Sequence, residues 1–281
     1  MILNFPLKIK SVGFFQIDDG DNSRFNISNY IYKIAERDFI LTISKIAKYR
    51  IYDGDFIEVD VCEDADEKSV NLFLNTYALG ALLHQRAQIS FHGSSFILNG
   101  KGVVICGNSG AGKSSISYAL CRSEGIFQND DVTPVKITHT GVKMLPLNEK
   151  IKLWEQTLNK LNIDFSSLES IRPDLNKFFI PVGDTLKEET DLHHIIILSV
   201  RSEGGFSFRE LSGVDKYNAL RKSIYRKSYL RGMPETGKIY FSQLLDIARF
   251  VRVTEVVRPE ECDIMECAGY IRQLIFNRQA L

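Results

Sequence analysis

A glycine-rich segment in the first half of this 281-residue chain constrains its fold more than any other feature. The segment fits the pattern G-x-x-x-x-G-K-[ST], and its residues are Gly107, Asn108, Ser109, Gly110, Ala111, Gly112, Lys113 and Ser114. The apolar run 103–106 before it is typical of a buried strand, and residues 115–122 after it have the spacing of an amphipathic helix. The order strand, glycine loop, helix predicts an α/β fold.

Each part of this segment has a chemical reason to bind phosphate. Glycine lets successive backbone N–H groups turn toward one anion, and the start of a helix adds positive potential. Lys113 would reach the β- and γ-phosphates of a nucleotide, the Ser114 hydroxyl would bind Mg²⁺, and Ser115 would complete the contacts. The sequence therefore predicts a nucleotide and Mg²⁺ at residues 107–115.

Composition narrows the class of protein. Hydrophobic residues make up 44% of the chain, enough for a sizeable core, and 35 basic residues balance 35 acidic ones. A chain without net charge is a poor candidate for a nucleic-acid partner, which needs a basic face. No run approaches the ~18 apolar residues of a membrane span, and the five scattered cysteines lack zinc spacing. We expect a reduced, cytoplasmic protein with no membrane or nucleic-acid partner.

The pattern along the chain predicts two regions. Residues 1–66 are rich in short β-prone runs, with a hairpin at Asp53-Gly54, and we expect this region to pack on a larger P-loop domain over residues 67–281. That domain opens with a helix over about 65–86, whose apolar residues recur at helical spacing. We expect a mixed sheet with a β-rich N-terminal part.

Further elements follow from local signals. Asn99-Gly100 and Thr140-Gly141 predict hairpins, and 193–200 and 251–257 predict strands. Helices are expected at about 148–161 (with Trp154 inside it), 214–225, 241–249 and 263–277.

Two adjacent aspartates are the first candidates for chemistry beside the loop. Asp130 and Asp131 come after the expected P-loop helix and the next β-prone run, at a spacing that returns the chain to a strand beside the loop. One carboxylate could bind Mg²⁺ together with Ser114, and the other could accept a proton from an attacking hydroxyl. Two such neighbours would raise each other's pKa. The competing interpretation is a turn, because aspartates are common there.

His92 is the second candidate. It ends the β-prone run before the P-loop strand, where an imidazole could contact phosphate or tune the aspartates. The alternative is a histidine with a structural role at a strand end.

Taken together, these motifs resemble the catalytic domain of the HPr kinase/phosphorylase family, a P-loop group akin to phosphoenolpyruvate carboxykinase. The resemblance is carried by His92-Gly93, by the loop with its G-x-S-G-x-G-K-S form, and by Asp130-Asp131-Val132. It covers residues 70 to 160 best. The stretch 82–101 and the sequence Lys152-Leu153-Trp154 are similar to an HPr kinase-like branch associated with ribosomally made, modified peptides, including lasso-peptide kinases.

The resemblance implies roles for single residues. It makes Asp130 the general base for the acceptor hydroxyl, Asp131 the carboxylate on the Mg²⁺ side, and His92 a neighbour of the transferred phosphate. A downstream basic residue would help to bind phosphate, and Lys177 and Arg226 both remain open for that role.

The chain also departs from the family. Ser115 stands where HPr kinases carry an acidic residue, and the glycine- and arginine-rich signature that follows the aspartates in that family has no match. The first 60 residues also differ from the usual N-terminal domain. These departures argue against HPr as the substrate and against phosphorylase activity.

The resulting expectation is an ATP- and Mg²⁺-dependent kinase of the HPr kinase type that phosphorylates a hydroxyl, namely a serine of a peptide or small protein. A kinase for a small metabolite such as free serine and a non-catalytic nucleotide-dependent regulator are the alternatives. A GTPase is disfavoured, because no guanine-reading N-K-x-D occurs. Whether the chain forms a homo-oligomer is left open.

Overall fold

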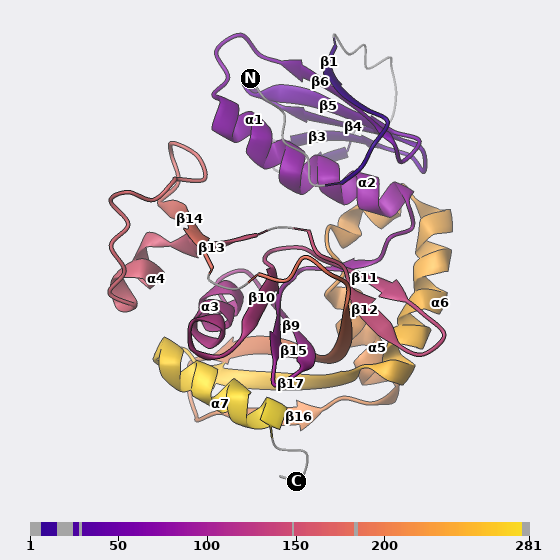
Figure 1. Cartoon of the computed structure of the whole chain (residues 1–281). Coiled ribbons are helices and arrows are strands. Elements are labelled where there is room, and N and C mark those ends of the chain that lie inside the picture. Colours follow the sequence, from indigo (N-terminus) through magenta and orange to yellow (C-terminus); the bar gives the residue numbers. More distant parts are fainter. Residues whose placement is uncertain (1–6, 16–24, 28–29, 148, 183–184, 277–281) are drawn as a thin grey trace. The chain divides into compact units, whose positions relative to one another are not determined.

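Strand β9 (Lys101–Gly107) leads into the glycine-rich segment and lies inside a nine-stranded mixed sheet of the computed structural model (Figure 1). The structure describes residues 7–15, 25–27, 30–147, 149–182 and 185–276. The other strands of this sheet are β7 (Ser90–Phe91), β8 (Gly93–Leu98), β10 (Ile126–Asn129), β11 (Thr133–Ile137), β12 (Val142–Met144), β15 (Thr190–Arg201), β16 (Ser207–Glu210) and β17 (Arg252–Pro259).

Strand directions decide which residues meet at one edge of the sheet. β15 runs parallel to both β9 and β17, while β8 runs antiparallel to β9 and to β10. β10 therefore runs in the same direction as β9. As a result, the carboxyl ends of β10, β9 and β17 and the amino end of β8 all lie at one edge.

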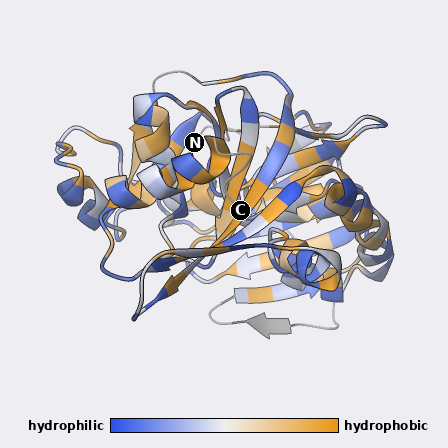
Figure 2. Ribbon diagram, turned by 90° about the horizontal axis from the view of Figure 1, so that it is seen from below, coloured by the Kyte–Doolittle hydropathy of each residue, from blue (hydrophilic) through white to orange (hydrophobic). Residues whose placement is uncertain are grey.

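Two helices cover one face of this sheet. α3 (Lys113–Ser123) follows the glycine loop, and α7 (Ile264–Phe276) follows β17. Ile116 of α3 and Ile271 of α7 share one buried cluster with Ile196 of β15. The helical ribbons in Figure 2 carry both hydrophobic and hydrophilic residues, as expected for helices that bury a single face.

A separate two-stranded ribbon, β13 (Lys150–Trp154) and β14 (Lys177–Pro181), precedes and follows the short helix α4 (Glu155–Lys160). The helix predicted over 148–161 is thus wrong in its first half, and Asn148 lies outside the described residues. The residue pattern explains the difference. Ile151 and Leu153 are buried while their neighbours are not, which is the alternation of a strand.

The N-terminal part forms a six-stranded sheet of its own, in the order β1-β6-β5-β4-β3-β2. Its strands are β1 (Ser11–Phe14), β2 (Phe25–Ile27), β3 (Tyr30–Ile34), β4 (Asp38–Ile43), β5 (Ala47–Tyr52) and β6 (Phe56–Val61). A continuous helical segment packs on it, made of α1 (Glu67–Phe73), a π-helical turn at Leu74–Ala78 and α2 (Leu79–Gln85). Leu41, Tyr49 and Leu82 are fully buried in the shared core.

The chain divides into two compact units. The first holds residues 1–89, 171–175 and 226–242, and the second holds 90–170, 176–225 and 243–281. Helices α5 (Gly213–Lys222) and η2 (Lys227–Arg231, a 3-10 helix) lie in the second and first unit respectively, and the division passes through α6 (Pro234–Phe250). The fold is mixed α/β, with mixed sheets and a β-rich N-terminal part.

Most sequence-based elements are confirmed. The hairpins at Asp53-Gly54, Asn99-Gly100 and Thr140-Gly141 are present, as are the strands at 193–200 and 251–257. The β-prone run that ends at His92 contains strand β7, whereas strands β14 and β16 were not predicted, because each is short or lies outside a clear apolar alternation.

The expectation that all cysteines are reduced is wrong for one pair. Cys262 and Cys267 form a disulfide, with their Cα atoms 6.6 Å apart, Cys262 lying just before α7 and Cys267 in its first turn. Cys106 is buried, as its apolar surroundings predicted. No helix in the described part of the chain is long and apolar enough to cross a membrane.

Candidate functional site

The glycine loop borders a cavity of about 420 Å³, whose lining comes from the second unit. Two glycines show why the loop needs its sequence. Gly107 lies so close to β15 that a Cβ atom would stand 2.3 Å from the carbonyl oxygen of Leu198. Gly112, at the start of α3, has a φ of +101°, which side chains disfavour. The strand–loop–helix geometry predicted for this segment is confirmed.

Lys113 is buried and contacts its own loop. Its Nζ donates to the carbonyl oxygens of Gly107, at 2.9 Å, and Asn108, at 3.1 Å. Burial lowers the pKa of this lysine, while the negative charges of Asp131 and Asp130 act in the opposite direction. The amino group of Lys113 is therefore held against the backbone of its own loop.

Asp130 lies against the loop serine. The Ser114 hydroxyl donates to Oδ1 of Asp130 at 2.7 Å, and the backbone N–H of Lys152 donates to Oδ2 at 3.0 Å. Asp130 is only 2% exposed, since β10 delivers it directly beside the start of α3. Ser115, the next residue along, has its hydroxyl 3.3 Å from that of Thr157.

Asp131 points to a different set of partners. His92 Nδ1 lies 3.0 Å from the Asp131 carbonyl oxygen and 3.3 Å from its Oδ1, and because both oxygens accept, Nδ1 carries the hydrogen. Lys152 Nζ lies 3.4 Å from Oδ2. Asp131 has a φ of +73°, an uncommon conformation for a residue with a side chain. Such strain is found preferentially at functional sites.

The electrostatics of Asp131 correct a sequence-based expectation. Adjacent aspartates were expected to raise each other's pKa. Burial does raise the pKa of Asp131, but the positive charge of Lys152 and the hydrogen bond from His92 outweigh it, and the pKa lies well below its usual value. Asp131 is therefore a carboxylate at neutral pH.

Lys177 faces the same cavity from β14. Its Nζ lies 5.3 Å from the centre of the Trp154 ring, directly across the ribbon. Burial lowers the pKa of Lys177, and Asp130 and Asp131 oppose this effect. Arg226, the other predicted phosphate contact, belongs to the first unit, where its guanidinium lies 3.5 Å from the centre of the Tyr77 ring.

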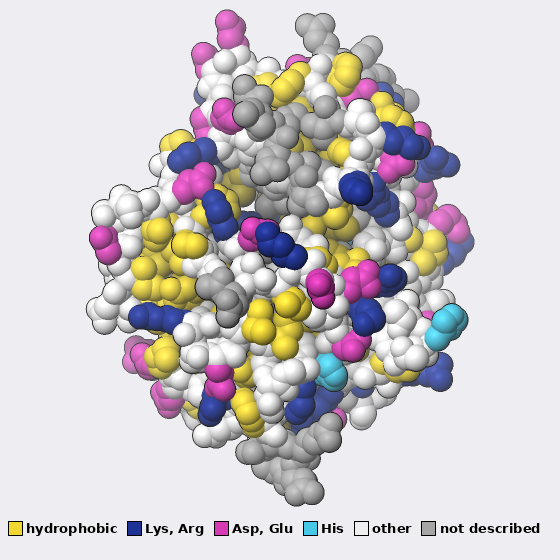
Figure 3. Space-filling model, viewed as in Figure 1, with side chains coloured by type: hydrophobic (Ala, Val, Ile, Leu, Met, Phe, Trp, Pro, Cys, Tyr) yellow, Lys and Arg dark blue, Asp and Glu magenta, His cyan; other side chains and the backbone are white. Residues whose placement is uncertain are grey.

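Hydrophobic side chains gather on the surface over β13, β14 and α4 (Figure 3). Trp154 of β13 lines the cavity and is 46% exposed. The mouth of the cavity on this side is therefore bordered by an apolar surface.

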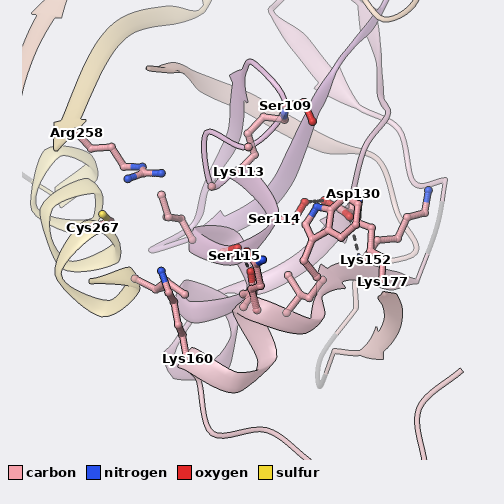
Figure 4. A pocket seen from close by; sticks show the side chains of 18 of the residues that line it. Ser109, Lys113, Ser114, Ser115, Asp130, Lys152, Lys160, Lys177, Arg258 and Cys267 are labelled. Atoms are coloured by element: carbon pink, nitrogen blue, oxygen red, sulfur yellow. Dashed lines mark hydrogen bonds between the residues drawn. The ribbon is translucent and has the colours of Figure 1, made fainter. Parts of the chain in front are cut away.

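The opposite side of the cavity is formed by β17 and α7. In the view of Figure 4, Arg258 and Cys267 lie to one side of Lys113, and Asp130, Lys152 and Lys177 lie to the other. The Arg258 Nε donates to the carbonyl oxygen of Ala111 inside the glycine loop, at 2.9 Å.

Sequence reasoning missed Lys152 and Arg258. Lys152 was assigned to a helix, although the alternation in residues 150–154 could have indicated a strand with one polar face. Arg258 lies almost 150 residues after the loop, and only the order of the strands brings it there.

The oxygen ligands fit a hard cation. The Ser114 hydroxyl and the Asp130 carboxylate lie together at the loop, and Mg²⁺ is commonly bound by one or two such groups with the remaining ligands from phosphate and water. The described residues contain no group of three or more His, Cys, Asp or Glu able to hold a metal by themselves. A cation here would thus rely on phosphate oxygens.

No protein-family model and no curated protein sequence matches this chain. Among solved structures, the Hpr(Ser) kinase/phosphatase from Coxiella burnetii is similar in fold, with a TM-score of 0.38 and 14% sequence identity over 66% of this chain and 93% of that chain.

Proposed function

We propose that this protein is an ATP- and Mg²⁺-dependent kinase that transfers the γ-phosphoryl group to a hydroxyl, namely a serine of a peptide or small protein. One observation carries the proposal. A phosphate-binding loop, a serine–aspartate pair suited to Mg²⁺ and a second aspartate paired with histidine and lysine all line one cavity.

The contacts favour a division of labour between the aspartates that reverses the roles implied by the family resemblance. Asp130 contacts Ser114, the hydroxyl that would bind Mg²⁺, so we assign the metal side to Asp130. Asp131 turns away from that pair toward His92, so we assign it the acceptor hydroxyl.

In the proposed transfer, one bond to phosphorus forms, one breaks, and one proton moves. The acceptor oxygen forms a bond to the γ-phosphorus, the bond from that phosphorus to the β-bridging oxygen breaks, and ADP leaves. The hydroxyl proton moves to the Asp131 carboxylate. A carboxylate of low pKa is a weak base, but in a loose transition state the hydroxyl loses its proton late, so orientation matters more than basicity.

The cations surround the group that moves. Lys113 is in place at the loop, and Lys152 and Lys177 approach from the ribbon on the Asp131 side. Fixed positive charges near developing negative charge supply much of the catalysis in such reactions. Mg²⁺, when bound at Ser114 and Asp130, would supply further charge neutralisation at the phosphates.

The surface beside the cavity supports a peptide acceptor over a small metabolite. Trp154 is half exposed at the mouth, over a ribbon with a hydrophobic surface. A free amino acid would need no such surface, whereas residues flanking a serine in a chain could pack on it.

The test is phosphoryl transfer from γ-labelled ATP with Mg²⁺, using a serine-peptide library and, separately, free serine and other small hydroxy compounds. Lys113→Ala serves as the inactive control. Label on peptide serine with the wild type alone is the expected result. Label on small compounds only would replace the peptide by a metabolite, and nucleotide binding without transfer to any acceptor would overturn the kinase in favour of a nucleotide-dependent regulator.

A further inference from the structure

Arg258 is a cation in the cavity that the proposed transfer does not yet use. It is the residue before the last of β17, at the same sheet edge as the glycine loop. Its Nε donates to the Ala111 carbonyl oxygen at 2.9 Å, and its Nη1 donates to the carbonyl oxygens of Pro259, at 2.7 Å, and Glu260, at 3.0 Å.

These contacts fix the guanidinium, and no carboxylate of the described residues forms a salt bridge with it. An arginine has five N–H donors, of which three are used on backbone carbonyls, and both hydrogens of Nη2 remain. Burial lowers the pKa of Arg258, with the charge of Glu260 opposing this effect, and the group stays charged. A fixed cation with two donors left is suited to a phosphate.

The remaining donors lie beside the phosphate-binding loop. Nη2 is 3.7 Å from the position that a Cβ atom on Gly112 would occupy, and Gly112 directly precedes Lys113 at the start of α3. Glycine at this position leaves open the space between the guanidinium and the loop. A phosphate bound by the loop would therefore meet Arg258 as well.

The side on which Arg258 lies decides which phosphate it meets. Arg258 and Asp130 lie on opposite sides of Lys113 in Figure 4. The transferred phosphate has to be next to the aspartates, so the phosphates that stay with the leaving nucleotide are the ones within reach of Arg258.

We propose that Arg258 binds the non-transferred phosphates of the donor nucleotide through Nη2, which makes it a determinant of affinity for the ADP part. This inference rests on the proposed function of the cavity. It adds a residue for which the sequence motifs carry no signal. Because ADP keeps these phosphates after transfer, the contact persists in the product complex.

The experiment measures binding of MgADP to the full chain by calorimetry, in wild type, Arg258→Gln and Arg258→Lys. Hydrogen bonds to charged groups correspond to roughly a 10- to 100-fold change in binding, and we expect a loss of that order for Arg258→Gln and a smaller one for Arg258→Lys. Arg252→Gln is the matched control, because Arg252 starts the same strand and pairs with Glu210 away from the loop.

Phosphorus NMR of MgADP bound at saturation distinguishes direct contact between Arg258 and a phosphate from a purely structural role of Arg258. Direct contact requires the resonance of a bound phosphate to move between wild type and Arg258→Gln, while identical spectra mean that Arg258 only supports the loop through Ala111 and overturn the inference. Affinity within twofold of wild type also overturns it and leaves the kinase proposal intact. Failure of the wild type to bind MgADP at all would overturn both proposals.

Discussion

The two sides of the cavity are built differently. On one side, Asp131 contacts His92 and Lys152 through side chains that can gain or lose a proton or change partners. On the other side, Arg258 is held by three backbone carbonyls and has no such freedom. The difference indicates that the aspartate side is suited to the chemical step and the arginine side to retaining the nucleotide.

The largest effect is expected on the aspartate side. Asp131→Asn removes the proton acceptor while keeping the shape of the side chain, so turnover should fall by ~10²-fold or more. Affinity for MgADP should stay within about twofold, since the carboxylate pairs with His92 and Lys152 and makes no hydrogen bond to a residue of the loop within the described chain. Asp164→Asn, an exposed aspartate of a surface turn, is the control. Steady-state kinetics measures the turnover, and calorimetry measures the affinity for MgADP. Normal turnover in Asp131→Asn would refute the role of Asp131 as base.

Asp130→Asn sharpens the division between the two aspartates. Loss of its charge should raise the Mg²⁺ concentration for half-maximal turnover by ~10- to 100-fold, with partial recovery at high Mg²⁺. Ser114→Ala should shift the same midpoint in the same direction, because the two side chains are joined at 2.7 Å. A Mg²⁺ titration of turnover is the measurement. A shifted midpoint in Asp131→Asn with a normal one in Asp130→Asn would restore the roles implied by the family resemblance.

The pH dependence tests the charge environment of Asp131. Its low pKa keeps the carboxylate ionised in acid, so wild-type turnover should persist below the ordinary aspartate pKa of about 3.9 as long as the fold survives. Lys152→Met removes the positive charge that contributes most to lowering the pKa of Asp131. The acid limb of the pH profile of turnover should therefore move to higher pH. Lys150→Met is the matched control, since Lys150 lies on the same strand but pairs with Glu169. An unchanged acid limb in Lys152→Met would contradict this account.

The low pKa of Asp131 also makes the free energy of unfolding depend on pH, in the same direction as turnover. A carboxyl group whose pKa is lowered in the folded state stabilises the protein above its unfolded-state pKa, and this contribution is lost as pH falls through the folded-state value. The difference in the free energy of unfolding between wild type and Lys152→Met should therefore shrink in strong acid.

The smallest expected effect is a change in tryptophan fluorescence when nucleotide binds. Trp154 is the single tryptophan of the chain, and Lys177 lies over its ring. A phosphate bound in the cavity should draw Lys177 toward it and change the tryptophan emission. Titration with MgATP should show this change in the wild type and not in Lys177→Met. If the emission of the wild type stays constant at saturating MgATP, Lys177 does not contact phosphate.

The sequence predicted what depends on neighbouring residues. The glycine loop, its flanking strand and helix, and the hairpins at Asn99-Gly100 and Asp53-Gly54 all follow from local patterns, and the structure has them. That Asp130 and His92 line the same cavity as the loop was also accessible, because only one helix and one strand separate Asp130 from the loop, and only one hairpin separates His92 from it.

What the sequence could not supply depends on distant pairing. Arg258 reaches the loop because β15 lies between β9 and β17, an order that no local pattern encodes. Lys152 was missed because residues 150–154 were predicted to be helical. They form a strand, which pairs with another strand more than 20 residues later in the chain. The pKa of Asp131 was expected in the wrong direction, because the charge of Lys152 was not known to be there.

The most direct test of the central claim measures turnover and MgADP affinity side by side in Asp131→Asn and Arg258→Gln. We expect a reciprocal result. Asp131→Asn should lose turnover and keep its affinity, while Arg258→Gln should lose affinity and keep most of its turnover at saturating nucleotide. If both variants lower turnover and affinity to the same extent, the cavity does not divide chemistry from nucleotide retention, and the account is contradicted.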